Sequence, residues 1–182
     1  VAVMMPNVPQ YPVAVLAILR AGFVLVNVNP LYTPRELEHQ LKDSGAKAMI
    51  IIENFAATLQ QVIERTPVRH VVLTSIGDML GGVKGALVNG VVKYVKKMVP
   101  PFQLPQAVRF NQALAQGKHM TLLEANPGPE DIAVLQYTGG TTGVSKGAVL
   151  LHRNIIANLL QSEAWNSPLW KQIPDGEQPV MV

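Results

Sequence analysis

The chain has 182 residues, of which 48% are hydrophobic, and its formal net charge at pH 7 is +3. This length and composition predict a globular protein with a real core and exclude a disordered segment. The absence of cysteine excludes disulfides, thiolate chemistry and cysteine-based metal sites, and it fits a reducing compartment such as the cytoplasm. No apolar run approaches the ~18 residues of a spanning helix, so no membrane span is expected.

The basic residues are concentrated in one segment. Between Asp78 and Glu124 there is no acidic residue. The same segment contains six basic ones: Lys84, Lys93, Lys96, Lys97, Arg109 and Lys118. Because the whole chain has 15 basic and 12 acidic residues, the remainder is net negative. A local basic patch favours a local anionic partner and argues against a nucleic-acid-binding domain, so no nucleic-acid partner is expected.

Residues 1–74 alternate between strand and helix patterns. Strands are expected at 1–5, 23–28, 48–52 and 70–74, and helices at 11–21, 34–44 and 54–65. Thr33 and Glu36 are spaced as a capping box, with Pro34 at the first helical position. Continuous apolar strands alternating with helices predict an α/β fold, with a mostly parallel sheet and helices on both faces.

Residues 75–129 break this alternation and are interpreted as a glycine- and proline-rich insertion. One helix is expected at 87–99, with apolar residues on one side and Lys93, Lys96 and Lys97 on the other. Such a helix can make peripheral contact with an anionic membrane surface. The alternative is a surface helix packed on its own domain, which is favoured because most amphipathic helices pack in this way.

The most distinctive segment is YTGGTTGVSKGA, which lies between apolar runs at 132–135 and 148–151. This arrangement predicts a strand, a tight loop and a second strand. Glycines allow consecutive backbone N–H groups to turn inward and form an anion-binding concavity. The candidate phosphate-binding residues are Tyr137, Thr138, Gly139, Gly140, Thr141, Thr142, Gly143, Val144, Ser145, Lys146 and Gly147.

The spacing differs from a Walker A loop, because Val144 and Ser145 separate Gly143 from Lys146. A plain Gly/Thr surface turn is the alternative interpretation. The lysine and the flanking apolar strands favour phosphate binding, since a plain turn needs neither.

The same segment resembles the phosphate-binding loop of the adenylate-forming superfamily, whose pattern is roughly [YF]-T-[SG]-G-[ST]-T-G-x-P-K-G. Ser145 stands where most members have proline, and this difference leaves the phosphate donors intact. Residues 18–37 resemble the second core motif of that family. The run NVNPLYTPRELEHQLKDSGAKA, residues 27–48, is most similar to bacterial long-chain fatty-acid–CoA ligases.

The resemblance implies an ATP-dependent ligase that activates a long-chain fatty acid as an acyl-adenylate and transfers it to coenzyme A. It implies Mg²⁺ as a cofactor, with Thr141 or Thr142 contacting the metal. The chain would be a fragment of the large N-terminal domain, comprising a β/α unit (1–74), the insertion (75–129) and a phosphate-loop unit (130–182). No catalytic residue is expected in it, because the catalytic, adenine-binding and ribose-binding residues of the family and its C-terminal domain would lie elsewhere. The expected location is the cytoplasm, with the inner face of the cytoplasmic membrane as a peripheral site.

Two other classes stay open. One is another adenylate-forming enzyme, such as an aryl-CoA ligase or a peptide-synthetase adenylation domain. The other is a non-catalytic module that binds a phosphate-bearing ligand or a membrane. Neither the preferred acyl chain length nor the oligomeric state is predicted.

Overall fold

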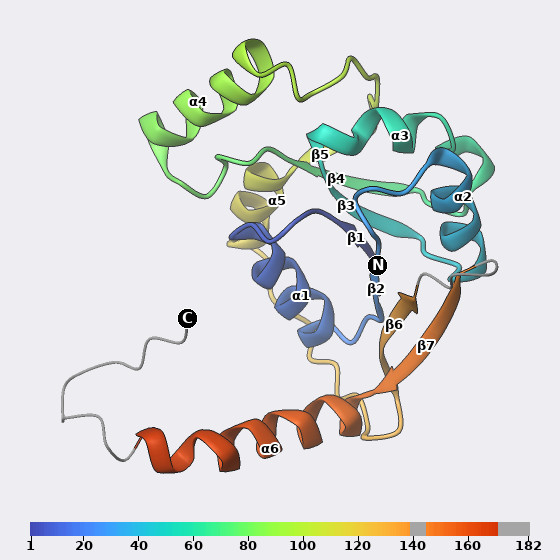
Figure 1. Cartoon of the computed structure of the whole chain (residues 1–182), viewed down its shortest axis with the longest axis vertical. Coiled ribbons are helices and arrows are strands. Elements are labelled where there is room, and N and C mark those ends of the chain that lie inside the picture. Colours follow the sequence, from blue (N-terminus) through green and yellow to red (C-terminus); the bar gives the residue numbers. More distant parts are fainter. Residues whose placement is uncertain (139–144, 171–182) are drawn as a thin grey trace.

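The computed structural model describes residues 1–138 and 145–170 (Figure 1). Within these residues one seven-stranded sheet has the order β5-β4-β3-β1-β2-β6-β7. The strands are β1 (Ala2–Met4), β2 (Leu25–Asn27), β3 (Ala48–Ile52), β4 (His70–Thr74), β5 (Val108–Arg109), β6 (Ile132–Thr138) and β7 (Lys146–Leu151). The helices are α1 (Gln10–Arg20), α2 (Pro34–Asp43), α3 (Ala56–Gln60), α4 (Gly82–Gly90), α5 (Phe110–Gly117) and α6 (His152–Trp170).

The sheet is parallel from β5 to β6, and only β7 runs antiparallel, to β6. The predicted mostly parallel α/β sheet is therefore confirmed. Its central strand β1 is buried along its whole length, which accounts for its uninterrupted apolar sequence. The strand expected at 132–135 returns beside β2, so the insertion does not displace it from the sheet.

Helices cover both faces of the sheet, as predicted (Figure 1). Successive side chains of a strand point to opposite faces, so Val3 and Met4 belong to different core clusters. On one face the core contains Val3, Leu25, Ala133 and, from α1, Ala14 and Ile18. On the other it contains Met4, Val26, Ile51 and, from α2 and α3, Leu37, Leu41 and Leu59.

The predicted capping box at the start of α2 is confirmed. The backbone N–H of Thr33 donates to Glu36 Oε2 at 2.8 Å, and the Glu36 N–H donates to Thr33 Oγ1 at 3.4 Å. These two bonds satisfy backbone donors that have no partner within the helix, so the beginning of α2 is fixed by local sequence.

The prediction of a single helix at 54–65 is wrong. The chain forms a 3₁₀ turn (η1, Glu53–Phe55), the short α3 and a second 3₁₀ turn (η2, Ile63–Arg65). Asn54 does not cap a helix; its side-chain amide donates to the Met98 carbonyl at 3.0 Å. Buried residues recur here every three positions, at Ala56, Leu59 and Val62. A 3₁₀-helix has three residues per turn, so this spacing places all three side chains on the same side of the segment.

The helix expected at 87–99 also has other bounds. It starts earlier, as α4 at Gly82, and continues as a π-helical turn (η3, Val91–Val95). Beyond it, Lys97 has a φ of 51°, which a continuing right-handed helix does not permit. The insertion also supplies β5 and α5, which were not predicted, and β5 pairs with β4 at the sheet edge. Residues 75–129 are therefore partly integrated into the sheet.

The favoured interpretation of this helix, packing on its own domain, holds for one side of it, where Gly85 and Asn89 contact the residues after β4. Leu87, Tyr94 and Val95 are 67%, 73% and 69% exposed. Figure 1 shows α4 at the upper left, at the margin of the domain. In the part of the chain that the structure describes, no helix is long and apolar enough to cross a bilayer.

α4 meets the sheet through two glycines. A Cβ on Gly77 would lie 2.5 Å from the Gly85 carbonyl oxygen, and a Cβ on Gly85 would collide with the Gly77 carbonyl. The helix can approach the end of β4 only because both positions lack a side chain.

Candidate functional site

The β6–β7 hairpin positions the predicted phosphate loop. Tyr137 pairs with Gly147, and Thr138 pairs with Lys146, so the two ends of the loop lie opposite each other. The structure thus brings together Tyr137, Thr138, Ser145, Lys146 and Gly147 of the predicted site. The other predicted residues, Gly139, Gly140, Thr141, Thr142, Gly143 and Val144, lie outside the described residues. The two candidate Mg²⁺ contacts are among them.

The loop begins at the carboxyl end of β6, inside the parallel part of the sheet. Ligands of open α/β sheets bind outside this edge, where the connections that follow neighbouring strands leave toward opposite faces. The connection after β1 leads to α1 on one face, and the connection after β2 leads to α2 on the other. The last described residues before the loop therefore lie beside a natural crevice of the fold.

Tyr137 anchors the loop to α2. Its side chain is 8% exposed, and its hydroxyl donates to Asp43 Oδ2 at 2.5 Å. Burial raises the pKa of Tyr137 well above its ordinary value, and the hydrogen bond to Asp43 raises it further. The hydroxyl therefore stays protonated at physiological pH and is committed to Asp43.

Gly147 completes this anchor. A Cβ at this position would lie 3.1 Å from the ring of Tyr137, closer than ordinary van der Waals contact. The glycine lets the aromatic ring lie across β7, so the motif glycine has a packing function next to the loop.

A cavity of about 350 Å³ lies at the carboxyl ends of β1, β2 and β6, next to Tyr137. Its lining residues are Val3, Met5, Asn7, Tyr11, Asn27, Val28, Asn29, Gln136 and Tyr137. The amides and the phenol among them give this cavity both donors and acceptors.

A chain of hydrogen bonds crosses this cavity from α1 to β6. The Tyr11 hydroxyl donates to Asn27 Oδ1 at 2.9 Å, and Asn27 Nδ2 donates to Gln136 Oε1 at 2.8 Å. Gln40 of α2 also donates to the Asn27 carbonyl, at 2.7 Å. These bonds fix the edge of the sheet from which the loop starts. Sequence reasoning missed them, although a polar residue at the end of an apolar strand, as at Asn27 and Gln136, was an available signal.

Metal ligation by acidic or histidine side chains is not indicated in the described part of the chain. Residues 1–138 and 145–170 contain no group of three or more histidine, aspartate or glutamate side chains that could hold a metal ion. The chemistry offered here is that of an anion site, with Lys146 supplying positive charge beside the loop.

Residues 1–181 match the sequence profile of the family described as AMP-binding enzyme. The chain belongs to the AMP-binding enzyme family. The sheet and the loop-bearing hairpin described above are thus parts of the AMP-binding fold.

Relatives within this family differ in their degree of similarity. The chain is 60% identical over 93% of its length to a long-chain-fatty-acid–CoA ligase of Escherichia coli O157:H7. It is 28% identical over 92% of its length to 4-coumarate–CoA ligase 4 of Arabidopsis thaliana. The crystal structure of a long-chain-fatty-acid–CoA ligase from Archaeoglobus fulgidus superposes with a TM-score of 0.59 at 29% identity. That superposition covers 89% of this chain and 27% of the archaeal one.

The chain spans about 30% of the length of the bacterial relatives that it matches. The features described here correspond to one portion of those proteins. The superposition with the archaeal enzyme confirms the predicted fold, a mostly parallel α/β sheet that forms part of an adenylate-forming enzyme domain.

Proposed function

We propose that this chain is the phosphate-binding portion of an ATP-dependent long-chain fatty-acid–CoA ligase. The observation that carries the proposal is the 60% identity to a bacterial long-chain-fatty-acid–CoA ligase across 93% of the chain. The much lower identity to the 4-coumarate enzyme, 28%, argues against an aryl-CoA ligase as the first choice. The geometry is consistent with nucleotide binding, because the loop starts at the carboxyl edge of a parallel sheet.

The proposed reaction has two steps. A carboxylate oxygen of the fatty acid attacks the α-phosphorus of ATP, and the bond from this phosphorus to pyrophosphate breaks. The product is an acyl-adenylate. The thiol of coenzyme A then attacks the acyl carbon and loses its proton, and AMP leaves with the bonding electron pair.

The loop between Thr138 and Lys146 would hold the β- and γ-phosphates of ATP. Reactions at phosphorus depend on charge neutralisation and alignment more than on covalent help from the protein. Lys146 supplies charge at one end of the loop, and Tyr137 keeps the other end in place through Asp43. Mg²⁺, when bound, would neutralise the phosphates further, and the hydroxyl of Thr141 or Thr142 would contact it. No side chain of this chain is assigned a catalytic role.

We further infer that the α4–η3 segment, residues 82–95, contacts an anionic membrane surface, with the protein on the cytoplasmic side. Two observations support this contact: the exposed apolar side chains of the segment and the six basic residues between Asp78 and Glu124, with no acid among them. Each lysine near an anionic surface contributes about 1 kcal/mol of attraction. Binding of the intact protein to phosphatidylglycerol vesicles should therefore weaken with added salt. Replacing Lys93, Lys96 and Lys97 together with glutamine should remove this salt dependence, and equal binding to neutral and anionic vesicles would contradict the contact.

Adenylation by the intact protein tests the ligase proposal. Exchange of labelled pyrophosphate into ATP should require a long-chain fatty acid and should fall at least ~10-fold in Lys146→Ala, because a charge-assisted phosphate contact is lost. Lys118→Ala, an exposed lysine of the insertion, is the matched control and should leave exchange unchanged. Melting temperatures should be similar in both variants, because neither lysine is buried.

The alternatives give other outcomes. Exchange supported by an aryl acid or an amino acid, but not by fatty acid, would indicate another adenylate-forming enzyme. The absence of exchange with any carboxylic acid would favour a non-catalytic module.

A further inference from the structure

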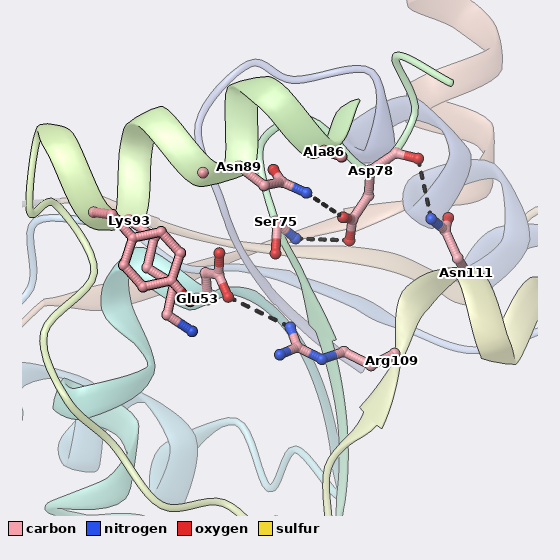
Figure 2. Close-up of a pocket in the computed structure, with 10 residues that line it drawn as sticks. Glu53, Ser75, Asp78, Ala86, Asn89, Lys93, Arg109 and Asn111 are labelled. Atoms are coloured by element: carbon pink, nitrogen blue, oxygen red, sulfur yellow. Dashed lines mark hydrogen bonds and ion pairs between the residues drawn. The ribbon is translucent and has the colours of Figure 1, made fainter. Parts of the chain in front are cut away.

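A second cavity, of about 440 Å³, lies between the insertion and the carboxyl ends of β3, β4 and β5 (Figure 2). It is lined by Glu53, Ser75, Asp78, Ala86, Asn89, Gly90, Lys93, Tyr94, Arg109 and Asn111. It shares no residue with the cavity beside Tyr137, so it is a separate site. Its position is again the carboxyl edge of parallel strands, where open α/β sheets bind ligands.

One side of this cavity is a completed structural contact. Asp78 Oδ2 accepts from the Ser75 N–H at 2.8 Å and from Thr74 Oγ1 at 3.1 Å. Its Oδ1 accepts from Asn89 Nδ2 at 3.0 Å, which ties α4 to the end of β4. Because three donors already hydrogen-bond to Asp78, this carboxylate stabilises the wall of the cavity and does not need a cation as a partner.

The other side carries an excess of positive charge. The Glu53 side chain is 5% exposed, and Arg109 Nη1 reaches its Oε2 at 3.4 Å (Figure 2). Among the described residues this long bond is the one hydrogen bond that the Arg109 guanidinium makes, although it has five N–H donors. Lys93 enters the same cavity from above, so two cations surround one buried carboxylate. A guanidinium with uncommitted donors, next to an ammonium group, suits an oxyanion.

The backbone gives an independent indication of a site. Lys93 and Tyr94 lie in the π-helical turn η3, and the Lys93 ammonium lies 5.8 Å from the centre of the Tyr94 ring. Single π-helical turns are rare and occur frequently at functional sites, because they change the direction in which one or two side chains point. Here the residues of this turn that line the cavity are Lys93 and Tyr94.

Exposed apolar side chains of the α4–η3 segment indicate where the oxyanion comes from. Leu87, Val91 and Val95 of the same segment are 67%, 37% and 69% exposed. An oxyanion bound by Lys93 and Arg109 would therefore be held in part by a segment that also exposes apolar side chains, which a free ion does not need but the chains of a lipid do. We propose that this cavity binds the phosphate of an anionic phospholipid headgroup. The proposal that the cavity binds a phosphate depends on the cavity alone. The proposal that this phosphate belongs to a lipid depends on the membrane contact proposed above.

Two single-lysine variants of the intact protein distinguish a specific phosphate site from nonspecific electrostatic attraction to the membrane surface. Lys93 lines the cavity, whereas Lys96, three residues further on, does not. On vesicles of phosphatidylcholine mixed with phosphatidylglycerol, Lys96→Gln should bind about fivefold more weakly, the effect of one surface charge. Lys93→Gln should lose a charge-assisted hydrogen bond in addition and bind on the order of 50-fold more weakly. Equal losses in the two variants would overturn the proposal.

Glu53→Gln provides a change in the opposite direction. It removes the carboxylate that competes for Arg109 while keeping the shape of the side chain, so binding to the same vesicles should tighten. Replacing Arg109 would leave Glu53 buried without its partner and risks unfolding, so it is a poorer test. Weaker vesicle binding by a Glu53→Gln variant with a wild-type melting temperature would contradict the proposed site.

Inorganic phosphate identifies the source of the oxyanion. At ionic strength matched with chloride, phosphate should compete with phosphatidylglycerol vesicles for the wild-type protein, and this competition should be lost in Lys93→Gln. If phosphate raises the melting temperature of the wild type but not of Lys93→Gln, while vesicles bind both equally, the lipid assignment is overturned. Lys146→Ala should bind these vesicles like the wild type, so a failure of the ligase proposal remains distinguishable.

Discussion

The Tyr137 hydroxyl connects the base of the loop to α2, in addition to the pairing of β6 with β2. Its partner, Asp43, lies 94 positions earlier in the chain, at the end of α2. Because Tyr137 immediately precedes Thr138, the bond to Asp43 holds a position directly before the loop. In the proposed function, this residue would contribute to phosphate binding by holding the base of the loop.

Tyr137→Phe tests this anchor. The ring stays and the hydrogen bond to a charged group is lost, which should lower the melting temperature of the intact protein by about 3 °C. The KM for ATP in adenylation should rise more than kcat falls, because the loop loses its support. Asp43→Asn is the matched control, since the amide oxygen still accepts from the hydroxyl. If Tyr137→Phe and the wild type have the same KM for ATP, the anchor does not serve the loop.

Among the individual residues, those with local signals were predictable from sequence. Thr33 and Glu36 lie three positions apart, so their capping box needed no tertiary information. The motif around Tyr137 identified the loop, but the bond from Tyr137 to Asp43 and the one from Asn27 to Gln136 join residues 94 and 109 positions apart. Hydrogen-bond partners so far apart in sequence depend on the order of strands in the sheet, which the periodicity of apolar residues does not specify.

At the scale of secondary structure, the longer apolar strands were predicted well. The bounds of β3 and β4 match those expected, because five consecutive apolar or β-branched positions in β3 and four in β4 give a clear pattern. β5 has two residues and no periodicity of its own, so its position beside β4 depends on the sheet. The start of α4 was not predicted, because Gly81, Gly82 and Gly85 are typical of a turn, whereas α4 begins at Gly82 and contains Gly85.

The contact between α4 and the end of β4 depends on glycine and gives a prediction with an internal control. Gly85→Ala should force α4 away from Gly77 and cost about 1–3 kcal/mol of local stability. Hydrogen exchange should become faster across residues 82–95. Gly90→Ala, where a Cβ would meet nothing within 4 Å, should instead stabilise the same helix by up to ~1 kcal/mol. Equal exchange rates in the two variants would argue against the close approach.

α2 and η2 are linked by an ion-pair network centred on Glu38. Its carboxylate accepts from Arg65 and from Lys42 Nζ at 2.9 and 2.6 Å, and these bonds lower the pKa of Glu38 from 4.5 to about 2. A lowered pKa means that the stabilisation is present above pH 4.5 and is lost as the pH falls through about 2. Glu38→Gln should therefore melt slightly lower than the wild type at pH 7, and the difference should disappear toward pH 2. A difference that stays constant with pH would exclude an ionic origin.

For the whole molecule, the distribution of apolar surface is uneven. The sheet core is closed between α1 on one face and α2 with α3 on the other, whereas α6 extends away from the domain at the bottom of Figure 1. Ile156, Leu159 and Leu160 of α6 are more than half exposed. The α4–η3 segment adds further exposed apolar side chains, among them Leu87 and Val95, and exposed apolar surface favours association.

Residues 1–182 produced alone should therefore associate. We expect size-exclusion chromatography to show oligomers or aggregates, whereas the intact protein should elute as a defined species. ATP should bind the isolated chain far more weakly than it binds the intact protein, because the adenine and ribose contacts expected elsewhere would be missing. A monomeric isolated chain with the ATP affinity of the intact protein would show that these residues are a complete nucleotide-binding unit.

The strand order also has a consequence for synthesis on the ribosome. β2 has β1 on one side and β6 on the other, and the residues that pair across β2 and β6 are 109 positions apart. At about 5–20 residues per second, β6 leaves the ribosome roughly 5–20 s after β2. During that interval the β1–β4 half can already fold, but one edge of β2 has no neighbour. Nascent chains of this protein should therefore recruit chaperones until the β6–β7 hairpin docks, and slowing translation within the insertion should lengthen that interval.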